Sequence, residues 1–197
     1  MKKIILAGIA ITLLALACGE EEGVTPNVDY RVVSTSPRAV LVNVETAFNR
    51  GDLNLLKAML SENFVFYFDP EDVGQMVPGG IIPETCNYAE FIRTVENLFR
   101  LSYSVSMTIN TEHVGAPGSG ANTFRAEDVD AELIVMMDEV SGYWGESLCD
   151  LEFEKYRSKS GAYYWHLTKW WDNANDYGDA RARNWPYSIG KIIWQFS

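Results

Sequence analysis

Two kinds of hydrophobic spacing follow one another along the chain, the first typical of helices and the second typical of strands. Apolar side chains recur every three or four positions in residues 40–48, 55–60 and 91–99, so each stretch predicts a helix with one buried face. From residue 102 to residue 109 the apolar side chains alternate with serine and threonine. This alternation predicts a strand with one buried face and one solvated face.

Residues at the ends of these stretches support the helices. Ser36 before Pro37 is a typical helix start, because serine caps free amide groups and proline suits the first helical position. Gly51 is placed to end the first helix. Asn87, with Glu90 three residues later, forms the pattern of a capping box and predicts the start of a third helix.

Aromatic and β-branched runs predict the strands that complete the domain. The first run ends at the Asp69-Pro70 step, and the glycines and prolines up to Pro83 indicate a loop. We expect strands at residues 64–68, 102–109, 123–137, 143–157 and 162–171. The order helix, helix, strand, helix and four meandering strands predicts an α+β domain.

The first eighteen residues form a segment of a different kind. Two lysines precede an unbroken apolar run, Ile4 to Ala17, that is too short to cross a bilayer as a permanent helix. Cys18 and Gly19 follow it, and glutamates come next. A basic start, a short apolar stretch and a small-residue processing site together predict a signal peptide over residues 1–18.

The end of this segment, Ala15-Leu16-Ala17-Cys18, is similar to the lipobox of bacterial lipoproteins. The resemblance implies that Cys18 is acylated on sulfur, as with palmitate, and becomes the new N-terminus. Lipid would then anchor the protein in the bacterial cell envelope, at either the inner or the outer membrane. Ordinary secretion with cleavage nearby, or an uncleaved anchor, is the alternative.

The rest of the chain has the size and composition of one folded domain. Residues 19–35 are acidic and polar and indicate a flexible linker, so we expect the domain at residues 36–197. Hydrophobic residues make up 47% of the sequence and aromatic residues 13%, which is enough for a substantial core. The net charge of −11 argues against nucleic acid and anionic lipid headgroups as partners.

Two cysteines remain within the domain, and either a disulfide or two separate buried thiols fits them. An oxidising compartment would allow Cys86 and Cys149 to pair. Together with His113 and His166, these cysteines show no spacing typical of metal ligands. The glycine-rich stretch after residue 114 joins two predicted strands and is not a phosphate-binding loop. We therefore expect neither a metal nor a cofactor.

Three segments of the domain resemble the NTF2-like superfamily, also called SnoaL-like. They are Ala47 to Asp52, the stretch from Leu60 to Asp69-Pro70, and Trp170-Trp171-Asp172. The resemblance covers about residues 36–175 and implies a cone-shaped barrel in which three helices pack on a strongly curved mixed sheet, with a pocket at its open end. The superfamily contains isomerases, dehydratases and hydrolases as well as non-catalytic binding and dimerisation modules, so the fold implies no activity.

Asp69 and His166 are the candidate catalytic residues. Asp69 matches the place of the general-base aspartate in the ketosteroid isomerases of this superfamily. Val44 stands where those enzymes have the tyrosine that stabilises the oxyanion, which argues against steroid-type isomerisation. His166 with Asp69 or Asp172 resembles the histidine and aspartate pairs of related dehydratases. The alternatives are a structural histidine and an aspartate that caps the loop backbone.

Aromatic side chains crowd the last third of the sequence and indicate a binding pocket. The residues expected to line it are Phe66, Phe68, Asp69, Trp165, Trp170 and Trp171. Packing of the C-terminal tail onto the sheet is the alternative use of the extra tryptophans. The sequence favours non-catalytic binding of a small apolar molecule or an envelope protein. An isomerase or lyase using Asp69 with His166, and a structural homodimer through the outer sheet face, are the alternatives.

Overall fold

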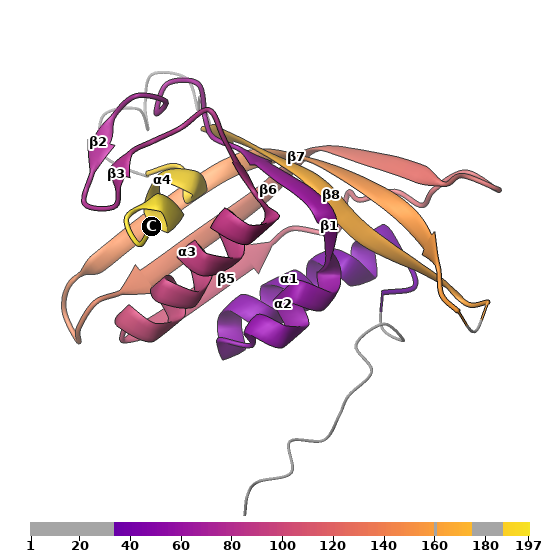
Figure 1. Cartoon of the computed structure of the whole chain (residues 1–197), viewed down its shortest axis with the longest axis horizontal. Coiled ribbons are helices and arrows are strands. Elements are labelled where there is room, and N and C mark those ends of the chain that lie inside the picture. Colours follow the sequence, from indigo (N-terminus) through magenta and orange to yellow (C-terminus); the bar gives the residue numbers. More distant parts are fainter. Residues whose placement is uncertain (1–33, 160, 175–186) are drawn as a thin grey trace, which may run out of the picture.

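Helices pack against one face of a large β-sheet in the computed structural model of this chain (Figure 1). The structure describes residues 34–159, 161–174 and 187–197. The helices are α1 (Pro37–Arg50), α2 (Leu53–Met59), α3 (Tyr88–Leu101) and the C-terminal α4 (Ile189–Trp194). The strands are β1 (Leu60–Tyr67), β2 (Met76–Val77), β3 (Gly80–Ile81), β4 (Thr85–Asn87), β5 (Ser104–Ile109), β6 (Thr123–Met136), β7 (Gly142–Arg157) and β8 (Tyr163–Ala174).

Local capping contacts place the helices where the sequence predicts them. The Ser36 hydroxyl accepts a hydrogen bond from the Ala39 amide (3.1 Å), and Gly51 ends α1 in the left-handed conformation, at φ 62°. At α3, the Asn87 side chain accepts from the Glu90 amide, while the Glu90 carboxylate accepts from the Asn87 amide. These contacts satisfy amide groups that a helix start leaves unpaired. The predicted start and end of α1 and the predicted start of α3 are confirmed.

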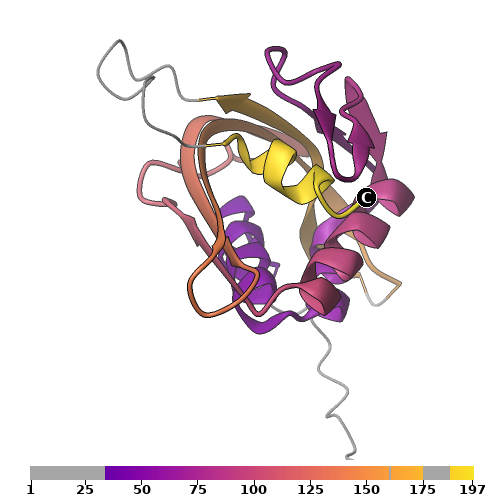
Figure 2. The same cartoon turned by 90° about the vertical axis from the view of Figure 1, so that its left-hand side faces the viewer.

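The large sheet is mixed and curved. Its strand order is β4-β1-β8-β7-β6-β5, with β1 and β8 parallel and the other neighbours antiparallel. The pairing of β6 with β7 and of β7 with β8 each contains an irregularity, at residues 126–129 and 152–153. Such bulges bend and twist a sheet, and this one wraps around the helices (Figure 2). The predicted α+β fold, with helices on a strongly curved mixed sheet, is confirmed.

Small strands depart from the predicted pattern. β4 pairs with β1 at the sheet edge, but its three residues are too few for alternation to be recognised. The loop after Asp69 contains the short hairpin β2–β3, in which Gly80 has φ 115°, a conformation that glycine adopts readily. β1 begins at Leu60 rather than at Phe64, because Leu60 already pairs with Leu167 of β8.

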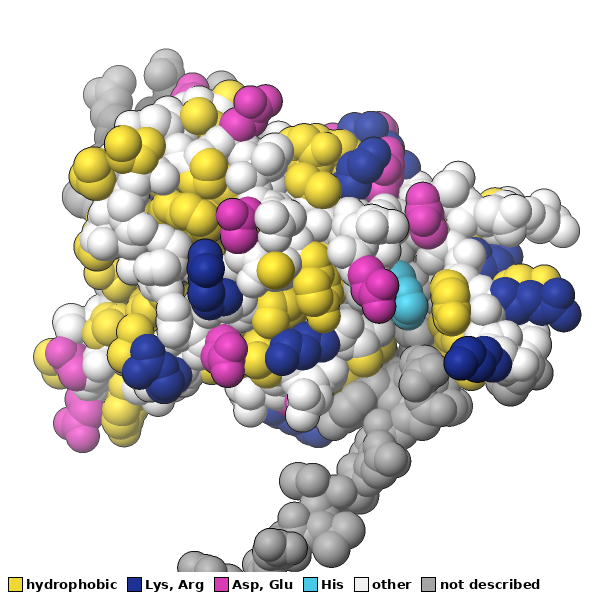
Figure 3. Space-filling view, in the orientation of Figure 1, with side chains coloured by type: hydrophobic (Ala, Val, Ile, Leu, Met, Phe, Trp, Pro, Cys, Tyr) yellow, Lys and Arg dark blue, Asp and Glu magenta, His cyan; other side chains and the backbone are white. Residues whose placement is uncertain are grey.

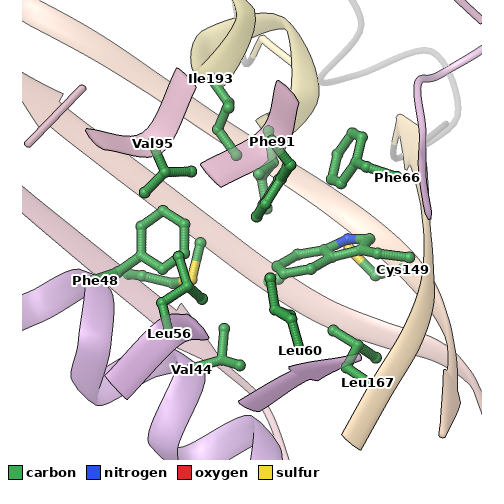
Figure 4. Close-up of a cluster of buried hydrophobic side chains, with 14 of the residues drawn as sticks. Val44, Phe48, Leu56, Leu60, Phe66, Phe91, Val95, Cys149, Leu167 and Ile193 are labelled. Carbon is green, nitrogen blue, oxygen red and sulfur yellow. The ribbon is translucent and has the colours of Figure 1, made fainter. Parts of the chain in front are cut away.

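The C-terminal helix α4 lies across the wide end of the curved sheet (Figure 2). The side chain of Ile193, a residue of α4, points toward Val95 and Phe91 of α3 (Figure 4). The tail residues that are buried in the common hydrophobic core are Ile189, Ile192, Ile193 and Phe196. The tail therefore fills the wide end of the cone, as the tail-packing alternative proposed.

Two glycines allow this close approach of the tail. A Cβ atom on Gly145 of β7 would lie 2.5 Å from the Tyr187 carbonyl oxygen. A Cβ atom on Gly190 would lie 2.7 Å from Asp172 Oδ2 and 2.8 Å from the Phe66 ring. Neither position has room for a side chain. Helix α4 can therefore pack against β7 and β8 only because both residues are glycine.

The cysteine pairing that the sequence left open is not formed. Cys86 lies on β4 and Cys149 on β7, and both are buried free thiols. Two strands, β1 and β8, separate them. Three strand spacings amount to about 14 Å, whereas a disulfide needs Cα atoms within about 7 Å. Burial raises the pKa of Cys86 to about 12 and that of Cys149 above its ordinary value, which keeps both thiols protonated and unreactive.

The predicted signal peptide, the lipid attachment at Cys18 and nearly all of the linker lie outside the described residues. The described residues begin inside the predicted linker, at Ser34, which is buried and whose carbonyl accepts from the Trp165 amide (2.8 Å). Within the part of the chain that the structure describes, no helix has both the length and the apolar character needed to cross a membrane.

Candidate binding site at the open end of the cone

Two aspartates come together where the parallel strands β1 and β8 end. Asp69 follows β1, and Asp172 lies near the end of β8. Tyr67 of β1 pairs with Trp171 of β8, so the two carboxylates belong to the same end of the sheet. Both are buried, with exposed fractions of 5% for Asp69 and 1% for Asp172. This end of the cone is also where α4 begins.

Asp172 holds the first turn of α4. Its Oδ2 accepts a hydrogen bond from the Gly190 amide (2.6 Å), and the hydroxyls of Ser147 and Ser188 lie close to the carboxylate. Ser147 Oγ in turn accepts from the Ile189 amide (3.2 Å). The unpaired amides of a helix start favour a negative charge here.

Burial nevertheless dominates the proton affinity of Asp172. Removal from water raises its pKa to about 6, the hydrogen bonds from Ser147, Gly190 and Ser188 lower it, and the nearby charge of Asp69 raises it again. The second oxygen, Oδ1, is shielded from solvent and has no hydrogen-bond partner among the described residues. Asp172 is thus a carboxyl that can change its protonation near neutral pH.

Asp69 caps the loop that it begins. Its Oδ1 accepts from the Glu71 amide (2.7 Å), and its backbone carbonyl accepts from the amides of Asp72 (3.0 Å) and Val73 (3.2 Å). This is the loop-capping role that the sequence offered as the alternative to a pocket role.

Asp72 ties the same loop to α4. Lys191 Nζ donates to Asp72 Oδ1 (2.9 Å) and to Gln75 Oε1 (2.7 Å), and Ser188 Oγ donates to Asp72 Oδ2 (2.5 Å). Both members of the Lys191–Asp72 ion pair are largely buried. The sequence analysis missed these roles, and the Ser188-Ile189-Gly190 helix start was the local signal for them.

His166 is not brought to Asp69. Leu167, its neighbour, pairs with Leu60 at the start of β1, whereas Asp69 follows the end of that strand. His166 stacks on Tyr156 (5.7 Å between ring centres) and lines a separate, open groove of about 750 Å³ with residues of α2 and the start of β1. The Asp69–His166 pair of the enzyme hypothesis is therefore not formed in this structure.

Three of the five aromatic residues predicted to line the pocket belong to the core instead. Phe66, Trp165 and Trp170 are nearly inaccessible, and Phe66 packs against Trp170 with ring centres 5.7 Å apart. The sheet alternates, so these side chains face the helices. Phe68 is as buried as Trp165 and belongs to the same core, but together with the partly exposed Trp171 it also lines a cleft at the rim.

The rim cleft has a volume of about 510 Å³. Its walls are Tyr67, Phe68, Pro70, Val73, Glu84, Trp171, Asp172 and Asn173. Tyr67 and Trp171 stack with ring centres 4.9 Å apart, and Arg125 (5.0 Å) and Lys169 (5.5 Å) lie over the indole. The cleft thus combines an apolar aromatic wall with two carboxylates, a composition typical of small-molecule sites.

Comparison with known proteins informs the fold only. Neither a family model nor a curated protein matches the sequence. Among solved structures, a Novosphingobium aromaticivorans protein provisionally named an aromatic ring hydroxylase has a TM-score of 0.51 at 12% identity. The alignment covers 82% of this chain and 96% of that one.

Two further solved structures carry the NTF2-like name. One, from Salmonella enterica, has a TM-score of 0.48 at 10% identity over 72% of this chain and 91% of its own. The other, from Rhodospirillum rubrum and of unknown function in nutrient uptake, has a TM-score of 0.46 at 12% identity over 69% and 95%. Helices packed on a six-stranded mixed sheet, curved into a cone, give this chain an NTF2-like fold.

Proposed function

We propose that this protein is a lipid-anchored, non-catalytic binding protein of the bacterial cell envelope, and that its ligand is a small apolar molecule held in the rim cleft. The observation that carries the proposal is the position of α4. Because its isoleucines fill the wide end of the cone, a ligand at this end would bind in the rim cleft that the described residues form between β1, β8 and the loop after Asp69.

The aromatic wall favours an apolar, flat ligand. Tyr67 and Trp171 already stack on each other, and Phe68, Pro70 and Val73 extend the apolar surface. A flat molecule placed against Trp171 would bury its own surface and part of the indole, which is a favourable use of apolar contact area.

The carboxylates support binding more than catalysis. Asp69 is engaged with loop amides, and Asp172 Oδ2 with the first turn of α4. A general base must reach the proton that it removes, to within hydrogen-bond distance. Asp172 Oδ1 is shielded from solvent, so a ligand in the cleft does not reach it without movement of α4.

Asp172 is still the residue on which a second candidate function rests. A buried carboxyl with a pKa near 6 at the edge of a cleft is a usual feature of acid–base catalysts. An isomerase or lyase would therefore use Asp172 rather than the Asp69–His166 pair. Turnover of an enolisable ketone that Asp172→Asn abolishes would favour this function over the first.

Binding of the neutral fluorescent probe N-phenyl-1-naphthylamine tests the proposed site. We expect Trp171→Ala to weaken probe affinity about tenfold or more, because the variant loses the main stacking surface. The matched control is Trp144→Ala, which removes a half-exposed tryptophan of β7 that is not in the cleft wall. Equal affinities in the two variants would contradict the site and leave homodimerisation through the outer sheet face as the better account.

A further inference from the structure

The tip of the β7–β8 hairpin carries a local charge opposite to that of the chain. Lys155, Arg157 and Lys159 lie on it, and the sequence has no acidic residue from 155 to 163. The net charge of the whole sequence is −11. The end of the molecule at the right of Figure 3 shows Lys and Arg side chains beside hydrophobic ones. The net charge of the whole chain does not reveal this separation of a basic tip from an acidic body.

These cations are available to a partner. The ion pairs found among the described residues involve Arg125, Lys169 and Lys191, all outside the tip. Lys155 Nζ lies instead over the rings of Trp165 (5.0 Å) and Tyr163 (5.9 Å), and the Arg157 guanidinium lies over the ring of Tyr163 (5.7 Å). Contacts of this kind leave the positive charge unneutralised.

Two tyrosines give the tip an amphipathic surface. Tyr156 is 48% exposed and Tyr163 is 55% exposed, although both are large side chains. Tyrosine rings beside long cationic side chains are typical of the region where lipid headgroups meet water, because each side chain has an apolar body and a polar end.

The first described residue lies close to the tip of the same hairpin. The Trp165 amide of β8 donates to the Ser34 carbonyl (2.8 Å). Lys155 pairs with Trp165 and lies level with this point, and the turn at Gly161, four residues before Trp165, lies at most about 13 Å beyond it. Figure 1 shows the hairpin projecting from the body of the molecule.

The length of the chain before Ser34 agrees with a membrane nearby. Fifteen residues, 19–33, separate Cys18 from Ser34. The linker that the sequence predicts here would, as a flexible chain, have a root-mean-square span of about 21 Å and a fully extended reach of about 50 Å. A lipid on Cys18 would then hold the tip of the hairpin within this distance of the bilayer.

From these observations we infer that the β7–β8 tip contacts anionic phospholipid headgroups of the membrane that holds the protein. The inference rests on the lipid anchor of the proposed function. The lipid anchor keeps the tip at a high local concentration near the membrane. The three cations and the two tyrosines then orient the protein on the membrane surface. The acidic remainder of the molecule is repelled by the same surface, which turns the cleft-bearing body away from the membrane.

A fluorescent label at the tip tests this contact in the acylated full-length protein, bound to vesicles. Ala162→Cys carries a nitrobenzoxadiazole group, and Glu139→Cys in the β6–β7 turn carries it as the reference position. We expect a blue shift of the tip label on vesicles that contain phosphatidylglycerol. We expect no shift on phosphatidylcholine vesicles and none for the reference label.

Charge variants identify the groups responsible. Lys155→Gln, Arg157→Gln and Lys159→Gln combined should abolish the shift, since each cation near an anionic surface changes partition by about fivefold. The matched control is Arg50→Gln, Arg93→Gln and Arg100→Gln, which removes the same charge from exposed helix positions and should keep the shift.

The outcomes separate the tip contact from the anchor. Protein that floats with phosphatidylglycerol vesicles but shows no tip shift would overturn the tip contact while the anchor stands. Protein that does not float would remove the anchor, and the tip contact with it. A shift on both vesicle types, or one that requires envelope proteins rather than lipid, would also overturn the inference, the latter in favour of a protein partner.

Discussion

At the scale of single residues, Asp172 decides how the open end of the cone is built. One of its oxygens holds the first turn of α4, and the other is buried without a partner in the described part of the chain. Its burial raises its pKa from 3.8 to about 6. The folded chain therefore holds this proton more tightly than the unfolded chain does, so the stability that it contributes is present below pH 4 and lost as the pH rises through about 6.

The variant Asp172→Asn should remove that pH dependence. At pH 8 we expect its free energy of unfolding to exceed that of the wild type by up to about 3 kcal/mol, and at pH 4 to be nearly equal. Urea unfolding followed by tryptophan fluorescence at pH 4, 6 and 8 measures the difference. Asp130→Asn, at an exposed position of β6, serves as the control. Identical pH profiles for the two variants would contradict the assignment.

At the scale of elements, the C-terminal helix occupies the space that the open end of the cone would otherwise offer to a ligand. A six-residue helix is too short to be stable alone, so α4 depends on the contacts of its isoleucines and on the polar bonds from Asp172, Ser147 and Asp72. Its backbone fits only because Gly145 and Gly190 have no side chain.

Replacement of Gly190 by alanine tests this fit. The added methyl group would meet Asp172, Phe66 and Phe68 at 2.7–2.9 Å, so we expect a loss of about 1–3 kcal/mol in the free energy of unfolding. Gly118→Ala is the matched control, because nothing lies within 4 Å of its Cβ position, and its effect should stay within about 0.5 kcal/mol. Equal stability of the two variants in thermal unfolding would show that α4 packs less closely than described.

The elements that the sequence predicts are those with local signals. The caps at Ser36 and Asn87 accept from amides, and the amide of Gly51 donates to carbonyls, all within four residues. Strand alternation needs only the strand itself. β4 was missed because three residues carry no period, and its pairing with β1 is a non-local contact. The engagement of Asp172 by Gly190 is also non-local, so the sequence could not place the tail helix at the open end of the cone, where the resemblance implied a pocket.

At the scale of the whole molecule, the point of chain entry and the rim cleft lie at opposite ends of the sheet. The chain enters the fold beside the basic hairpin tip, the sheet runs away from that tip, and the rim cleft lies at the other end of β1 and β8. A protein tethered through its N-terminus would hold the cleft away from the lipid, where a ligand in the aqueous phase can reach it. This geometry gives the proposed anchor a role in presenting the site.

The anchor is tested by Cys18→Ser in the full-length chain. Acyl chains contribute about 0.8 kcal/mol for each buried methylene, so two or more hold a protein at a membrane almost permanently. In a bacterial host we expect the wild type in the membrane fraction and the Cys18→Ser variant as a larger, unprocessed precursor. Cys86→Ala leaves the signal segment intact and should be processed normally. Equal processing and membrane retention of wild type and Cys18→Ser would show that Cys18 is not the lipid attachment point, and the ordered arrangement of tip, body and cleft would then need another tether.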